Sequence, residues 1–133
     1  MHSRILLIGI LLWTVGTVAI RLAGQRLLHP DRPLASLILY LGSFVLMGWL
    51  ARRIFRRLGV ETRSWPAAAI LLMLPTLILD PFSCLFFTAI FPKVDPGAAG
   101  VFGGWMLICC AGVAAAVWVR PGDKSGSETR EQA

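Results

Sequence analysis

The chain has 133 residues, of which 56% are hydrophobic and only 15% are charged, and its formal net charge is +6. A soluble domain carries about 25% charged residues, so this composition excludes a soluble fold, which could not cover so much apolar surface. The basic residues stand at the ends of apolar runs, which argues against nucleic acid as a partner and favours a lipid bilayer with anionic phospholipid headgroups.

Four long apolar runs, separated by short connectors that carry arginine, make up nearly the whole chain. A helix needs about 20 apolar residues, at about 1.5 Å rise each, to cross the hydrocarbon core. The runs meet or nearly meet that length, so the sequence predicts an all-α integral membrane four-helix bundle that occupies residues 1–119. The predicted spans are residues 5–22, 34–51, 67–91 and 98–119.

The first run begins like a secretory signal peptide, because Arg4 precedes an apolar stretch. The stretch continues past the nearest match to a cleavage site, Thr17-Val18-Ala19, and reaches Arg21. A signal peptide usually has a hydrophobic region of about 7–15 residues, which is shorter than this run. We therefore expect the first run to be a retained membrane span.

Lysine and arginine are distributed unevenly between the two sides of the predicted bundle. Nine of the 13 basic residues belong to the amino terminus, the second connector and the tail. Cytoplasmic segments carry the positive excess, so both termini are expected on the cytoplasmic side of the cell membrane. The tail, residues 120–133, is polar without an apolar pattern and is expected to be disordered and cytoplasmic.

Four arginines at the end of the second run would form one basic face if the helix continued past the bilayer. The positive-inside rule alone accounts for such a cluster, and binding of acidic phospholipid is the alternative. The candidate headgroup contacts are Arg52, Arg53, Arg56 and Arg57.

An acid, Asp80, lies in the middle of the third apolar run. A charge at the bilayer centre costs about 2.5–3.5 kcal/mol on insertion scales, so the carboxylate needs an explanation. Pro75 removes a backbone hydrogen bond, and Asp80-Pro81 has the form of a helix N-cap followed by proline at the first helical position. The sequence therefore predicts a third helix that is kinked or broken at Pro75/Asp80-Pro81, with Asp80 at the break.

A partner for this acid is suggested by depth along the helices. Counted from the cytoplasmic ends of their runs, Arg21 and Asp80 both lie roughly 20–24 Å into the membrane. Buried membrane charges are usually paired. We therefore predict an intramembrane polar cluster of Asp80, Arg21 and Gln25, which either fixes helix register or serves a function.

Small residues predict where the helices approach one another. Gly100 and Gly104 form a G-x-x-x-G motif, which we interpret as a packing face within the chain and alternatively as the interface of a homo-oligomer. The cysteines Cys84, Cys109 and Cys110 lie inside apolar runs and are expected to be buried and inert. No spacing indicates a metal or a cofactor, and none is expected.

Two passages resemble a known family. Phe87 to Pro96, running into Phe102 to Leu107, and Arg21 to Gln25 are similar to an uncharacterised family of small bacterial four-span membrane proteins, catalogued as a domain of unknown function. The resemblance covers nearly the whole chain up to the tail and places Asp80 where that family has an acid. It departs at Lys93, where asparagine is common, and near Cys110, where a tyrosine is expected. It implies a bacterial inner membrane and no activity.

Function is predicted mainly from what the sequence contains and lacks. It has no G-x-S-x-G or H-E-x-x-H motif and no carboxylates paired at short spacing, so we expect no enzyme. The first hypothesis is a non-enzymatic structural or accessory membrane protein. The alternative is a small proton-coupled transporter that uses Asp80 as its intramembrane carboxylate.

Overall fold

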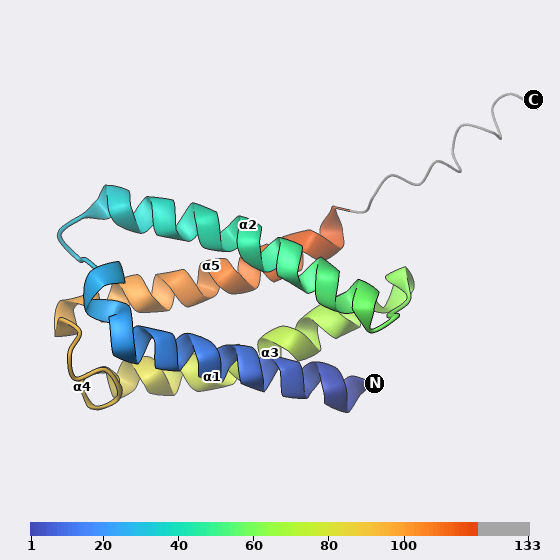
Figure 1. The fold of residues 1–133 in the computed structure, drawn as a ribbon, viewed down its shortest axis with the longest axis horizontal. Helices are drawn as coiled ribbons and strands as arrows, with labels where there is room; N and C mark the ends of the chain where they lie inside the picture. Colours follow the sequence, from blue (N-terminus) through green and yellow to red (C-terminus); the bar gives the residue numbers. More distant parts are fainter. Residues whose placement is uncertain (120–133) are drawn as a thin grey trace, which may run out of the picture.

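The computed structural model describes residues 1–119, and the predicted tail of residues 120–133 lies outside this part of the chain. The described residues form an all-α bundle, as predicted (Figure 1). Its long helices are α1 (His2–Leu27), α2 (Pro33–Arg57), α3 (Trp65–Leu85) and α5 (Ala99–Trp118). The short ones are η1 (Thr62–Ser64), α4 (Phe87–Ile90) and η2 (Pro96–Ala98).

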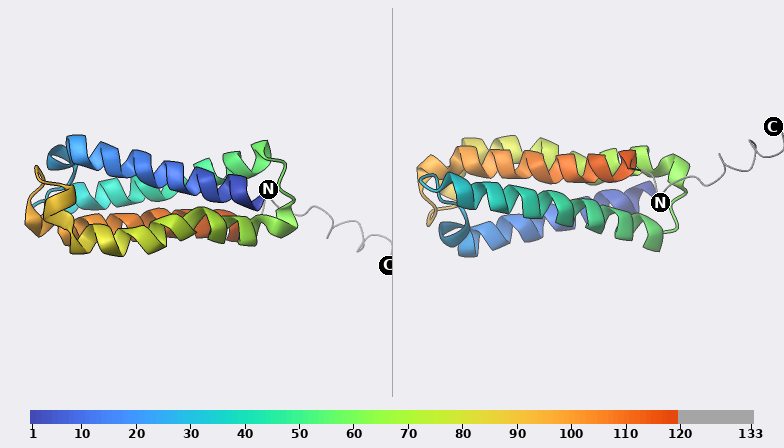
Figure 2. Two further views of the ribbon diagram at one scale, coloured as in Figure 1. Left: turned by 90° about the horizontal axis from the view of Figure 1, so that it is seen from below. Right: turned by 90° about the horizontal axis from the view of Figure 1, so that it is seen from above.

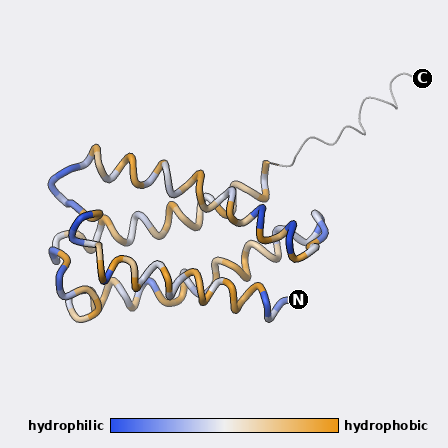
Figure 3. The backbone as a smooth tube through the Cα atoms, in the orientation of Figure 1, coloured by the Kyte–Doolittle hydropathy of each residue, from blue (hydrophilic) through white to orange (hydrophobic). Residues whose placement is uncertain are grey.

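Four helical segments are long and apolar enough to cross a membrane, which fits a multi-pass membrane protein. They are His2–Leu27, Pro33–Arg57, Thr62–Leu85 and Pro96–Trp118, so the first two continue beyond their predicted ends at residues 22 and 51, and the third stops before its predicted end at residue 91. The hydrophilic residues gather at the two ends of the bundle, and the middle is mostly hydrophobic (Figure 3). Most large apolar side chains in that middle are exposed on the outside, as expected for a surface covered by lipid.

The helices pack as two parallel pairs. The most extensive contact joins α2 to α5, the next joins α1 to α3, and α3 packs on α5 to hold the pairs together. The amino terminus, the η1 connector and the end of α5 lie at one end of the bundle, and α4 and η2 lie at the other (Figures 1 and 2). The odd crossings therefore run one way and the even crossings the other, as four successive spans require.

Local sequence explains where the helices begin and end. Pro33 and Pro66 stand in the first turns of α2 and α3, where a missing N–H is tolerated. Gly59 follows α2 with a φ of 65°, a conformation that glycine adopts without strain. Before α5, the Asp95 carboxylate accepts a hydrogen bond of 2.8 Å from the Gly97 N–H and shapes the polar hairpin.

Glycines set the closest helix approaches. A Cβ on Gly112 would meet the backbone carbonyl of Phe44, and one on Gly48 would lie 3.0 Å from the Gly112 oxygen. A Cβ on Gly104 would lie 2.5 Å from the Tyr40 hydroxyl, so Gly104 lies at the contact of α5 with α2. The other glycine of the predicted motif, Gly100, faces open space and takes no part in this contact.

Two apolar cores lie at opposite ends of the bundle. One contains Phe55 and Trp65, whose rings lie 5.8 Å apart, and the other contains three phenylalanines from α4, its end and α5. The Phe91 ring lies 5.1 Å from those of Phe87 and Phe102. The residues that carry the family resemblance thus form the packed aromatic core beneath the last hairpin.

The third helix is not broken at Asp80. Both Pro75 and Pro81 lie inside the continuous α3, and Asp80 makes no N-cap. Prolines are tolerated inside membrane helices because neighbouring groups and small local adjustments satisfy the freed backbone carbonyls. Of the two predicted forms, the broken helix is therefore wrong, while a helix kinked at its prolines is compatible with the continuous α3, which ends at Leu85, before the turn at Phe86 and the short α4.

Candidate functional site

The Asp80 carboxylate is buried near the C-terminal end of α3, and a side chain of α1 holds it by a hydrogen bond. Its Oδ1 atom accepts a hydrogen bond of 2.9 Å from Trp13 Nε1, and the residue is 8% exposed. Within residues 1–119 this is the one hydrogen bond made by the carboxylate, and no cation is paired with it. A neutral indole N–H thus orients the acid and leaves its charge without a countercharge.

The predicted cluster of Asp80, Arg21 and Gln25 does not form. Arg21 and Gln25 are both exposed. The Nη1 atom of Arg21 donates a hydrogen bond of 3.2 Å to the carbonyl oxygen of Ile90, the last residue of α4. A helix end leaves carbonyls without partners, and a long guanidinium reaches such an acceptor readily.

Helix register explains why the depth estimate was wrong. A Cβ on Gly9 would lie 2.6 Å from the Leu72 oxygen and 3.2 Å from Pro75, so this close contact fixes α1 against α3. That register brings Trp13 to Asp80. Arg21 lies about two turns beyond Trp13 on α1, at about 1.5 Å rise per residue, and therefore reaches the end of α4 and not Asp80.

A cleft of about 200 Å³ lies beside the acid, between α3 and α5. Its walls include Asp80, Pro81, Cys84, Met106 and Cys110. Two further wall residues, one on each helix, are exposed leucines on the lipid-facing surface: Leu77 and Leu107. The carboxylate therefore borders a space that reaches the outside of the bundle.

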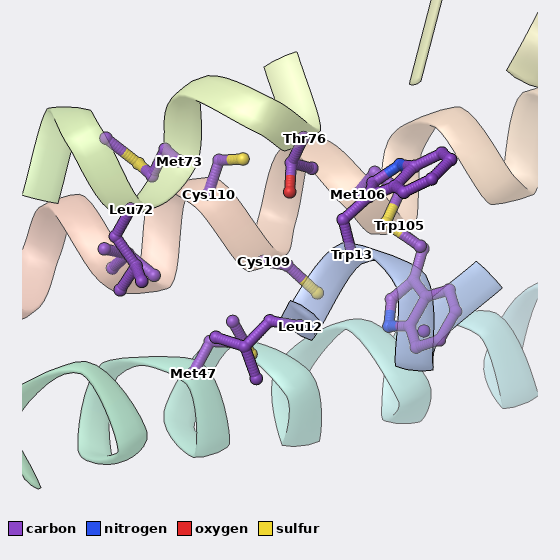
Figure 4. Close-up of a pocket in the computed structure, with 12 residues that line it drawn as sticks. Leu12, Trp13, Met47, Leu72, Met73, Thr76, Trp105, Met106, Cys109 and Cys110 are labelled. Carbon is purple, nitrogen blue, oxygen red and sulfur yellow. The ribbon is translucent and has the colours of Figure 1, made fainter. Parts of the chain in front are cut away.

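A second cavity of about 140 Å³ occupies the centre of the bundle, and all four long helices line it (Figure 4). It shares Met106 and Cys110 with the cleft, and Trp13 also lines it. Trp105 lies on its wall, and its Nε1 atom donates a hydrogen bond of 2.6 Å to the Ser43 hydroxyl of α2. Near it on α1, the buried Thr17 hydroxyl has no hydrogen-bond partner within residues 1–119. The cleft and the central cavity thus adjoin across two side chains.

The chemistry of this arrangement is that of a single acid in an apolar space. A carboxylate takes up and releases a proton or attracts a cation. Within residues 1–119 no group of three or more His, Cys, Asp or Glu side chains could hold a metal ion. Sequence reasoning missed the role of Trp13, although a tryptophan in the middle of a span needs an acceptor for its N–H.

The arginine cluster lies at the other polar feature, the end of α2. The Nε atom of Arg52 donates a hydrogen bond of 3.1 Å to the Ala116 carbonyl oxygen. The same guanidinium also donates a hydrogen bond to the Val119 carbonyl oxygen. It therefore caps the end of α5, where basic groups favour the helix dipole. The Arg53 guanidinium lies 5.3 Å from the Trp49 ring centroid. Arg56 and Arg57 are exposed beside them, around a shallow surface pocket.

Comparison with known proteins gives a family but no activity. The comparisons with curated proteins and with solved structures found no match. The family match covers residues 27–124, which leaves most of α1, with Trp13 and the Arg21 to Gln25 passage, outside it. It includes Asp80 and the aromatic core of Phe87, Phe91 and Phe102. The chain therefore belongs to the family of unknown function DUF5367.

Proposed function

We propose that this protein is a small, non-enzymatic, proton-coupled transporter in which Asp80 is the intramembrane carboxylate. The observation that supports the proposal most is the environment of that acid. It is buried in a membrane-spanning helix, has one neutral hydrogen-bond donor and borders a cleft. An ionisable residue kept inside a membrane at such a cost usually belongs to a substrate or proton pathway.

The substrate class that fits is a small apolar cation. The cleft walls beside Asp80 are almost entirely apolar, so the carboxylate is the one charged group there to attract a ligand. A cation and a proton cannot both be bound by a single carboxylate. Release of one on binding of the other would therefore couple the two movements in opposite directions.

Transport in proteoliposomes tests this proposal. Vesicles that contain the purified chain and a pH-sensitive dye would receive ethidium, a permanently charged apolar cation, across an imposed proton gradient. We expect ethidium movement to be coupled to proton movement in the wild type and to stop in Asp80→Asn. The asparagine oxygen still accepts the Trp13 hydrogen bond, so the fold remains. Equal transport by the two proteins would refute the proposal.

A structural or accessory role is the second candidate, and the Trp13–Asp80 hydrogen bond favours it. This bond joins α1 to α3, and buried polar pairs in membranes help to fix helix register. On this hypothesis Asp80→Asn leaves every property of the protein intact. Asp80→Leu, which removes the acceptor, lowers stability. The two variants together therefore distinguish a titrating acid from a structural one.

We further propose that both termini face the cytoplasm, in a bacterial inner membrane, and that anionic headgroups lie against Arg53, Arg56 and Arg57. Support comes from the excess of basic residues at that end of the bundle. Labelling of single cysteines from outside intact cells tests the orientation: Thr62→Cys should be protected and Lys93→Cys labelled. Labelling of Thr62→Cys from outside would reverse it.

A further inference from the structure

We propose that the central cavity binds one soft monovalent metal ion, Cu(I) or Ag(I), through cysteine thiolate and methionine thioether donors. The inference does not depend on transport or on Asp80. It starts from where the sulfur atoms lie. Apart from Met1, the chain has six sulfur-bearing residues, and every one lines either the central cavity or the adjoining cleft.

Five of the six line the central cavity itself, and they come from three different helices. The methionines are one each from α2, α3 and α5, and the two adjacent cysteines are on α5. One ion would take a single thiolate and the thioethers within reach of it, and the candidate donors are Met47, Met73, Met106, Cys109 and Cys110. The sixth sulfur residue, Cys84, lies in the cleft and not in the central cavity.

The two thiols reach different parts of this cavity. Neighbouring residues on a helix point about 100° apart, so Cys109 and Cys110 are poorly placed to bond with one another, and both are free. In Figure 4 the Cys109 sulfur turns toward Leu12, on the side of Met47. The Cys110 sulfur lies on the side of Met73 and Thr76. Each thiol thus has a methionine from another helix on its side of the cavity.

The type of donor selects the type of ion. Thioethers and thiolates are soft ligands that favour Cu(I), whereas carboxylate and imidazole ligands suit harder ions. The described residues hold no cluster of those harder ligands here. The long, unbranched methionine side chains are adaptable enough to close a cavity of about 140 Å³ around one small ion.

Charge balance favours a monovalent ion as well. Binding breaks one thiol S–H bond, forms one sulfur–metal bond and releases one proton to solvent. One thiolate with one monovalent cation is neutral overall, and the thioethers add no charge. A neutral complex suits an apolar cavity inside the membrane, where net charge is costly.

The test is a titration of the purified full chain in detergent with Ag(I). Calorimetry measures the affinity and stoichiometry of binding, and a pH indicator measures the proton that is released. We expect one Ag(I) per chain with release of a proton. Cys109→Ser with Cys110→Ser should weaken binding at least about 100-fold, and Met→Leu at all three methionines at least about tenfold. Leucine preserves the packing volume, so the triple variant should unfold at nearly the wild-type temperature.

The matched control is Cys84→Ser, which removes a thiol from the neighbouring cleft and should leave Ag(I) affinity unchanged. Unaltered affinity in the double cysteine variant, or in the triple methionine variant, would overturn the proposal. If the double variant does not fold, the wild type decides the matter. Its unfolding temperature should rise and level off at one Ag(I) per chain, and a flat response would also overturn the proposal.

Discussion

In both the α2–α5 pair and the α1–α3 pair, the two helices run parallel and approach each other closely at glycine residues, but the pairs differ in their polar groups. Between α2 and α5, two side chains donate hydrogen bonds to backbone carbonyls. The Tyr40 hydroxyl donates one of 2.7 Å to the Val101 oxygen, and Arg52 donates one to the Ala116 oxygen. Between α1 and α3, the indole of Trp13 meets the carboxylate of Asp80. In the first pair every hydrogen-bond acceptor is neutral, either a backbone carbonyl or the Ser43 hydroxyl that accepts from Trp105, while in the second pair the acceptor is a carboxylate.

The two pairs also differ in how much their polar groups add to stability. A membrane helix pair gains stability from close backbone approach and short hydrogen bonds, and α2–α5 has both at Gly48, Gly112 and Tyr40. A buried carboxylate adds little stability by comparison, because bringing it into the membrane is costly. The α2–α5 pair therefore contains the closest glycine approach, at Gly112, while the α1–α3 pair contains the buried acid.

The largest expected effect is at the α2–α5 contact. Gly112→Ala places a Cβ against the Phe44 backbone, which cannot yield as a flexible side chain would. We expect a loss of about 1–3 kcal/mol in the free energy of unfolding, measured by thermal unfolding in detergent. Gly100→Ala, in open space on the same helix, is the control and should be neutral or stabilising. Equal effects at the two glycines would contradict this packing.

An intermediate effect is expected at the α1–α3 contact. Trp13→Phe removes the indole donor and should cost about 0.6–1.7 kcal/mol, from the average to the largest hydrogen-bond energy measured in a membrane protein. In a double-mutant cycle, Trp13→Phe and Asp80→Ala should couple, whereas Arg21→Ala and Asp80→Ala should add. Coupling between Arg21 and Asp80, with additive effects of Trp13 and Asp80, would indicate an Arg21–Asp80 ion pair and refute the α1–α3 register that places Trp13 against Asp80.

The smallest effect is expected at the end of α5. Arg52→Gln loses the cap on the last carbonyls, and we expect a cost of about 0.3–1 kcal/mol in unfolding free energy. Arg57→Gln removes the same charge from an exposed position in the last turn of α2, where it makes no side-chain hydrogen bond among the described residues, and it should cost less than Arg52→Gln. Matching losses in these two variants would show that charge alone, and not the cap, is responsible.

Sequence periodicity and length were sufficient for the architecture but not for the site. Hydropathy predicts the four crossings because a membrane span has a fixed length. Asp80 is conspicuous because a charge is rare in such a run. Its partner depends on register between helices distant in sequence, which the contact of Gly9 with Leu72 and Pro75 sets in three dimensions.

The two prolines and the arginine cluster show the same limit. Pro75 and Pro81 predict a kink or a break by local rules, and because the bundle keeps α3 continuous the break does not occur. The pattern of arginines predicts one basic face, but only packing reveals that Arg52 turns onto α5 while Arg57 stays exposed. Local rules therefore describe the segments, and tertiary contacts decide what each polar group does.

The most direct test of the central claim is chemical labelling of Asp80 from the lipid side. A hydrophobic carbodiimide modifies carboxyl groups that it can reach within the membrane. We expect an adduct at Asp80, located by mass spectrometry, and faster modification in Trp13→Phe, where the carboxyl loses its one hydrogen bond. Modification confined to exposed acids such as Asp31 and Asp95, with Asp80 unreacted in both proteins, would contradict an accessible intramembrane acid.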